Sequence, residues 1–205
     1  MAELNSVTII RTMVNMFLLM TPFFVLSVFV SLTDQMTIKA RHMLAIRTTL
    51  AILIICTIIY LFGDVIFEYL GITLDAFRIG AGLVLLLSGI ELVRGTGGVR
   101  SMNTDDDGDL SVVPLAIPCT VGPGTIGALL VMGAGAETPM VRIVELIGIL
   151  FAGIFIGVVL YFSAAIERLV KRKGLTILSK LTGLFLAALA SEIIFTGIRN
   201  FLHLE

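Results

Sequence analysis

The sequence contains apolar stretches that are each about as long as an α-helix needs to be to cross a lipid bilayer. Roughly 20 apolar residues span a hydrocarbon core of about 30 Å. The stretches lie at residues 7–32, 48–70, 74–93, 112–133, 143–165 and 177–200. Only 14% of the 205 residues are charged, against about a quarter in soluble domains, and the mean hydropathy is +1.08. We therefore predict an all-α polytopic membrane protein with six transmembrane helices.

Two of these stretches carry residues that break helices. The fourth contains Pro118, Gly122, Pro123 and Gly124, and the first has a weaker break at Thr21-Pro22. Proline lacks a backbone N–H and clashes with the preceding turn, so both stretches should be interrupted and should leave backbone polar groups free. In a membrane such groups are tolerated where protein or a water-filled cavity surrounds them. The breaks therefore predict a bound solute; the alternative is a kink that serves only packing.

The predicted substrate-binding residues come from both breaks. A helix that resumes after Gly124 presents free N–H groups at the positive end of its dipole, which suits a carboxylate. Carbonyl groups released near residues 117–119 suit an ammonium or sodium ion, and threonine hydroxyls add further ligands. The predicted set is Thr21, Pro22, Pro118, Cys119, Thr120, Gly122, Pro123, Gly124 and Thr125.

A polar segment divides the chain into two halves. Residues 1–100 and 112–205 are each expected to form three spans, joined by an acidic cytoplasmic linker at 101–111. The linker contains half of an EF-hand-like calcium pattern, but Pro114 stands where the bidentate glutamate belongs, so we interpret it as a solvated loop. An odd number of spans per half predicts inverted repeats. The third and sixth spans are rich in glycine and alanine, which indicates close helix packing.

The basic residues are distributed unevenly between the two ends of the predicted spans. Ten of the 14 lysines and arginines fall on one side. The positive-inside rule then places the loops after the first, third and fifth spans in the cytoplasm. Both termini are expected on the outer, periplasmic or extracellular, side of the inner (plasma) membrane. The first stretch is long for a signal peptide and no cleavage pattern follows it, so we expect a retained span.

Ionisable residues inside spans are costly in lipid and often functional. Glu192 lies deepest in its span and is our candidate for a coupling carboxylate; the competing interpretation is an ion pair with Arg199 at the outer surface. Glu91 and Glu145 lie close to span ends, where solvation at the interface explains them at least as well as proton coupling does.

Several classes of function find no support in the sequence. A net charge of −1 with no basic patch argues against a nucleic-acid partner. The chain contains no His-Glu-x-x-His motif and no nucleophile elbow, so we do not expect an enzyme, and no metal or cofactor is implied. Cys56 and Cys119 both lie in apolar stretches. Pro118-Cys119 is similar to the proline-adjacent cysteines of membrane thiol transporters, which makes a thiol relay one alternative, although such proteins need a second thiol within reach.

Several motifs resemble the MarC family of six-span inner-membrane proteins, also called UPF0056 or the small neutral amino acid transporter type and distantly related to LysE-type exporters. The resemblance covers nearly the whole chain. Its most specific parts are Pro114-Leu-Ala-Ile-Pro118 with Gly122-Pro-Gly124, the run from Gly71 to Gly82, and the run from Gly174 to Leu184. Where members usually read Asn-Pro-x-Gly-x-x-Pro, this chain has Thr21-Pro-Phe-Phe-Val-Leu-Ser27. This departure predicts a bulkier and more helical first span.

The resemblance implies transport of small neutral amino acids. Together with the two breaks, it leads us to expect a secondary transporter or exporter of small zwitterionic metabolites that works by alternating access. The alternative from another class is a non-transporting membrane scaffold that binds a partner protein. The expected partners are the lipid bilayer and a small solute. Coupling to Na⁺ or H⁺, the direction of transport and assembly into a homo-oligomer are left open by the sequence.

Overall fold

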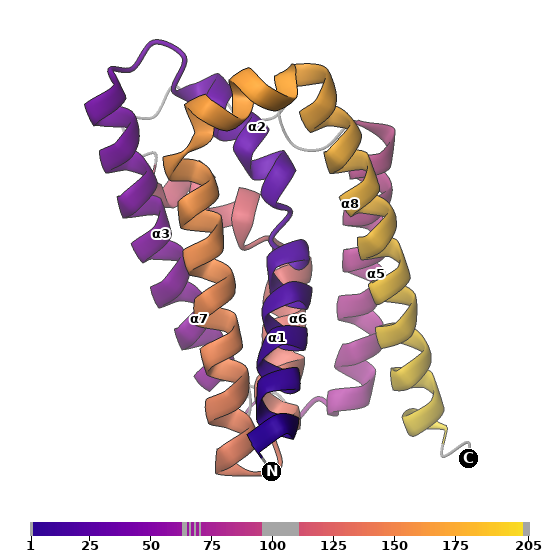
Figure 1. Cartoon of the computed structure of the whole chain (residues 1–205). Coiled ribbons are helices and arrows are strands. Elements are labelled where there is room, and N and C mark those ends of the chain that lie inside the picture. Colours follow the sequence, from indigo (N-terminus) through magenta and orange to yellow (C-terminus); the bar gives the residue numbers. More distant parts are fainter. Residues whose placement is uncertain are drawn as a thin grey trace.

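The computed structural model describes residues 2–62, 71–95 and 111–202, together with Val65, Phe67 and Tyr69. Every element in these ranges is a helix, which confirms the all-α prediction for the described part of the chain (Figure 1). The acidic linker predicted at 101–111 lies outside the described residues, apart from Ser111. The elements are α1 (Ala2–Leu19), α2 (Pro22–Leu32), α3 (Ile38–Leu61), α5 (Leu74–Arg94), the π-helix η2 (Ser111–Thr120), α6 (Pro123–Gly135), α7 (Pro139–Tyr161) and α8 (Ser163–Phe201).

Four described helices are long and apolar enough to cross a membrane. They are α3, α5, α7 and the Lys173–Phe201 part of α8. The helices α1 and α2 meet at a bend of 46° and together make a fifth candidate span. The fourth predicted stretch, 112–133, is divided between η2 and α6, and α6 has only 13 residues. The described helices thus support four or five spans, and the sixth stays a prediction.

Two helices begin earlier than the hydropathy of the chain predicts. The helix α3 starts at Ile38 rather than near residue 48, because Thr37 caps it: the Oγ1 atom of Thr37 accepts a hydrogen bond from the Ala40 N–H at 3.3 Å. The helix α8 starts at Ser163, directly after α7, so the loop predicted between residues 165 and 177 is helical instead. Charged residues lower the hydropathy there without breaking the helix.

The first part of α8 lies across one end of the bundle before the helix turns down along α5 (Figure 1). Some of the apolar side chains in this first part pack against the bundle. Ile166 and Val170 pack against a small cluster formed by Leu26, Val30 and Leu175. This contact attaches the first part of α8 to α2.

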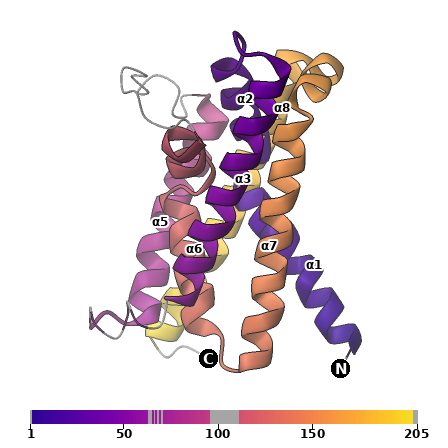
Figure 2. The same ribbon diagram turned by 90° about the vertical axis from the view of Figure 1, so that its left-hand side faces the viewer.

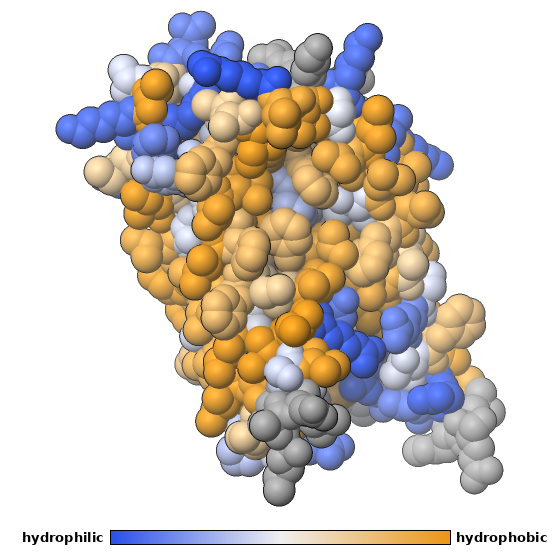
Figure 3. All heavy atoms as spheres, in the orientation of Figure 1, coloured by the Kyte–Doolittle hydropathy of each residue, from blue (hydrophilic) through white to orange (hydrophobic). Residues whose placement is uncertain are grey.

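The start of α1 and the end of α8 lie at the same end of the molecule, and the α2–α3 connection and the α7–α8 junction lie at the other (Figures 1 and 2). This agrees with the prediction that both termini face one side of the membrane; which side they face stays a prediction. On the face shown in Figure 3, hydrophobic side chains cover most of the middle, and hydrophilic ones gather at the upper end and in the lower half. Such a band is what a bilayer-embedded bundle presents to lipid.

Close packing between α5 and α8 depends on small residues, as the glycine and alanine content indicates. A Cβ atom added at Gly89 would lie 2.8 Å from the Gly183 carbonyl oxygen, and one added at Gly82 would lie 3.1 Å from the Ala190 carbonyl oxygen. Backbone atoms can come this close only where the side chain is absent. The two helices are therefore closely packed against each other along their length.

Candidate functional site

The break between α1 and α2 is centred on Thr21. This residue has φ 48° and ψ 57°, in the left-handed region, and it is the one non-glycine residue with positive φ in the described ranges. A β-branched residue rarely adopts this conformation, and strain of this kind gathers at functional sites. Pro22 then occupies the first turn of α2, where its missing N–H costs nothing. The first span is therefore broken here, although the comparison with the family motif predicts a more helical segment.

The second break joins η2 to α6. The wide turn of η2 ends with a hydrogen bond from the Val121 N–H to the Ala116 carbonyl at 2.8 Å, and the Thr120 hydroxyl donates to the Leu115 carbonyl at 2.8 Å. Gly122 then caps α6 without a side chain. The N–H groups of Gly124 and Thr125 are thus the donors that a helix start leaves without an intrahelical partner.

The two breaks are hydrogen-bonded to each other, although they are about a hundred residues apart in the sequence. The Thr125 hydroxyl donates to the Leu19 carbonyl at 3.1 Å. In return, the Thr21 hydroxyl donates to the Cys119 carbonyl, at a longer 3.5 Å. Each break therefore satisfies a carbonyl that the other leaves free. One carbonyl that we predict as a solute ligand, that of Cys119, is occupied by this contact.

A cavity of about 210 Å³ lies beside the crossed breaks. This is smaller than the roughly 300–1,000 Å³ of pockets that hold drug-sized ligands, so it suits a small metabolite. Pro22 is buried in α2 and does not line the cavity, and the side chain of Pro118 lies outside the described part of the chain. The other predicted site residues all line it: Thr21, Cys119, Thr120, Gly122, Pro123, Gly124 and Thr125.

The remaining lining comes from residues that the sequence reasoning did not assign to the site. Ser88 and Glu91 contribute polar groups from α5, and Leu186 contributes an apolar one from α8. The spacing of three residues puts Ser88 and Glu91 on neighbouring positions of one helix face. That spacing was a usable signal, but it does not show which face of α5 the broken helices meet.

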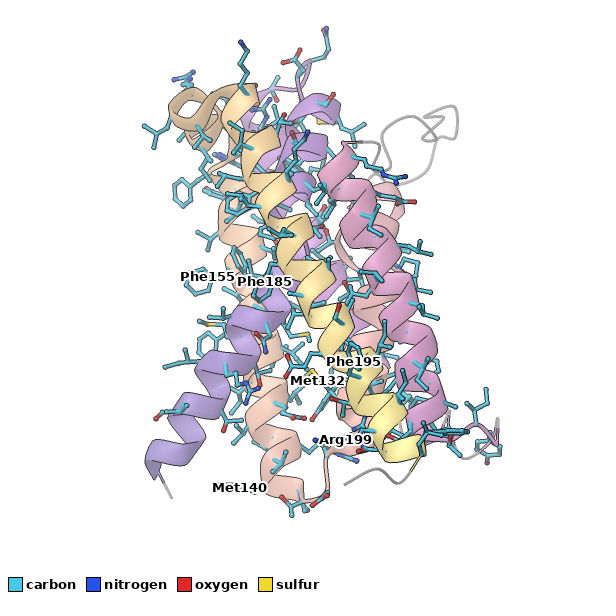
Figure 4. The ribbon with its side chains drawn as sticks, turned by 90° about the vertical axis from the view of Figure 1, so that its right-hand side faces the viewer. Met132, Met140, Phe155, Phe185, Phe195 and Arg199 are labelled. Carbon is cyan, nitrogen blue, oxygen red and sulfur yellow. The ribbon has the colours of Figure 1, made fainter. Side chains whose placement is uncertain are left out.

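Glu192, the predicted coupling residue, does not belong to this cavity. Its side chain is exposed on α8, and it is absent from the cavity lining. Phe195 and Arg199 follow it toward the end of α8 that leads to the C-terminus (Figure 4). Both Glu192 and Arg199 are described, and the structure gives no ion pair between them. Neither interpretation of Glu192 gains support, and its coupling role stays a prediction.

A second cavity of about 320 Å³ adjoins the first. The two share Phe24 and Leu92 in their lining, so these side chains separate them. Gly95, at the end of α5 opposite the chain termini, also lines the second cavity. Its polar lining consists of hydroxyl side chains, those of Ser27, Ser31, Thr176 and Ser179. The second cavity thus lies on the side of the crossed breaks that faces the end of the bundle we predict to be cytoplasmic.

The other half of the bundle, toward the chain termini, is closely packed around α6. A Cβ atom at Gly127 would lie 2.6 Å from that of Ala81, and Gly133 lies directly against the Tyr60 carbonyl. The Tyr60 hydroxyl in turn donates to Glu145 Oε2 at 2.8 Å, and Arg142 donates to the Gly133 carbonyl at 3.3 Å. These contacts join α3, α6 and α7, so this side of the bundle is closely packed.

Cys119 gives a direct chemical test of the cavity. Both cysteines are free, and Cys119 lines the cavity whereas Cys56 is buried in the core from α3. In a Cys56→Ser protein we expect N-ethylmaleimide to alkylate Cys119 slowly, because only 6% of the residue is exposed, and a bound solute to slow the reaction further. Mass spectrometry of the intact protein measures the rate. A rate that no small amino acid changes would count against the site.

The fold defines a polytopic helical membrane protein with a cavity beside two broken helices. Residues 6–202 match the MarC family of integral membrane proteins, and the chain belongs to that family. It is 32% identical to a UPF0056 membrane protein of Methanocaldococcus jannaschii, over 91% of this chain and 93% of the relative. It is 29% identical to the UPF0056 membrane protein YhcE of Escherichia coli, over 91% and 90%. No solved structure matches the chain.

Proposed function

We propose that the chain is a secondary transporter or exporter of small neutral metabolites, with zwitterionic amino acids as its substrate class. The observation that carries this proposal is the cavity of about 210 Å³ beside the two crossed helix breaks, which has threonine, serine and glutamate side chains in a mainly apolar lining. Broken helices in transporters present helix starts to anionic groups and unwound carbonyls to cations. The start of α6, with its uncapped first turn, offers the first of these to the carboxylate of an amino acid.

The arrangement of the helices supports a mechanism of alternating access. In the first half of the chain, the α1–α2 pair and α5 run away from the end where α1 begins, and α3 runs toward it (Figures 1 and 2). In the second half the directions are opposite: α6 and the second part of α8 run toward that end, and α7 runs away from it. This pattern supports two inverted three-helix repeats with the solute between them. Rocking one repeat against the other would open the closely packed side around Gly127 and Gly133 and would close the bundle around Phe24, which lines both cavities.

The competing function is a membrane scaffold without transport. A scaffold has no need of a polar centre, and its core is expected to be dry and fully packed. The threonines of both breaks and Ser88 and Glu91 line the cavity instead, which favours a solute. A thiol relay is tested separately: a protein with both Cys56→Ser and Cys119→Ser that keeps full activity would remove it.

A flux assay with imposed gradients tests the proposal. Purified protein in proteoliposomes is given radiolabelled glycine, alanine, serine or threonine, with and without inward gradients of sodium or protons. We expect uptake above that of empty liposomes for at least one small neutral amino acid, and little for lysine or glutamate. The gradient that accelerates uptake identifies the coupling ion. Equal uptake with and without protein, under every gradient, would favour the scaffold.

A further inference from the structure

We propose that Glu91 is the carboxylate that binds the ammonium group of the transported amino acid. The inference rests on the proposed function and deepens it, because it assigns the second charge of a zwitterion to a side chain. Among the described residues that line the cavity beside the breaks, Glu91 is the single charged one. A cavity with one carboxylate and one uncapped helix start matches a solute that carries one positive and one negative group.

The position of Glu91 on α5 sets the distance between these two groups. Leu85 is in contact with the start of α6, because a Cβ atom at Gly124 would lie 3.1 Å from the Leu85 Cα. Glu91 follows six residues later, about 9 Å along the helix axis. Six residues also turn the position by about 600°, so Glu91 lies about a third of a turn around α5 from Leu85, and it is exposed. Glu91 and the first turn of α6 therefore line the same cavity at separate positions.

No interaction within α5 stabilises a negative charge on Glu91. It lies in the last turn of α5, where the Gly95 N–H bonds to the Glu91 carbonyl. A carboxylate is unfavourable at this negative end of a helix dipole. Arg94 lies one turn further on, and no ion pair joins it or any other described cation to Glu91. A cationic group bound in the cavity would compensate both effects.

Solvation at the membrane interface is the competing explanation for Glu91, and a pair of ligands separates the two. Alanine and propionate have the same carbon skeleton and carboxylate, but propionate lacks the ammonium group. We expect Glu91→Gln, which preserves the size of the side chain, to weaken alanine binding about tenfold or more and to leave propionate binding unchanged. The variant is therefore expected to lose its preference for alanine over propionate.

The experiment measures the thermal stability of the purified protein in detergent against increasing alanine and propionate, with alanine uptake measured in parallel. Glu137→Gln is the matched control, because Glu137 is exposed and lines neither cavity, and it should behave as the wild type does. Glu91→Asp keeps the charge and should recover part of the alanine affinity. Size-exclusion profiles show whether each variant is folded, and the aspartate variant keeps the test decisive if the glutamine variant is not.

Several results would overturn the assignment. Unchanged alanine affinity in Glu91→Gln would do so, and so would an equal loss for alanine and propionate. If sodium stabilises the wild type but not Glu91→Gln while alanine affinity is the same, the carboxylate binds a coupling cation and the assignment is wrong. These results leave the proposed function intact. A wild type that neither binds nor transports any amino acid would refute the proposed function, and the role of Glu91 with it.

Discussion

Replacing Gly122 by leucine is expected to abolish transport while the protein stays folded. Gly122 lines the cavity beside the breaks, and its backbone is extended, with φ −79° and ψ 173°, which any residue can adopt. A leucine side chain would therefore fill part of a cavity of only about 210 Å³ at little cost to the fold. We expect uptake in proteoliposomes to fall to the level of empty liposomes, with an unchanged size-exclusion profile.

The matched control is Gly80→Leu. Gly80 is exposed on α5, and nothing lies within 4 Å of a Cβ atom added there. The same chemical change at that position should leave uptake near that of the wild type. Gly124→Leu is a poorer test, because its side chain would meet Leu85 and disturb the packing of α5 on α6. Normal uptake by Gly122→Leu would show that the solute does not pass through this cavity.

Gly133→Ala is expected to destabilise the protein strongly although it adds a single methyl group. A Cβ atom at Gly133 would overlap the carbonyl oxygen of Tyr60, so α6 and α3 would have to move apart. Overpacking of this kind costs about 1–3 kcal/mol, and backbone atoms cannot change rotamer to relieve it. The shift would also weaken the contact of the Tyr60 hydroxyl with Glu145. The measurement is the midpoint of thermal unfolding in detergent.

Gly135→Ala provides the comparison within the same helix. The nearest atom to a Cβ added there is Arg78 Nη2, at 3.6 Å, which is an ordinary contact with the mobile end of a side chain. Its unfolding midpoint should stay close to that of the wild type. If both substitutions lower the midpoint equally, the close approach of α6 to α3 is not what stabilises this end of the bundle.

Local sequence features predict the helices and the breaks well. The helix at 74–93 is observed as Leu74–Arg94 because Thr73 caps its start and Gly95 ends it in the left-handed conformation. Both breaks occur where proline and glycine predict them. The starts of α3 and α8 differ because hydropathy reports the preference for lipid, whereas a helix continues through polar residues until a residue breaks it.

The candidate site was predictable only in part, for a related reason. Residues at the breaks could be assigned from their backbone chemistry alone. The contribution of α5 could not, because the face that Ser88 and Glu91 share becomes part of the site only when α5 packs against α6. The same packing leaves Glu192 outside the cavity, although its position far from the ends of its predicted span made it the candidate for a functional carboxylate. Burial of a face is a tertiary property, and hydropathy along one helix does not contain it.

The central claim is that small zwitterionic solutes cross the membrane through the cavity beside the crossed breaks, and solute counterflow tests it most directly. Proteoliposomes are loaded with unlabelled glycine, alanine, serine or threonine and diluted into a trace of the same labelled compound, without any ion gradient. For at least one of these amino acids, we expect labelled solute to accumulate transiently with the wild type but not with Gly122→Leu. Labelled solute that never exceeds the level in empty liposomes, for any of them, would contradict this account.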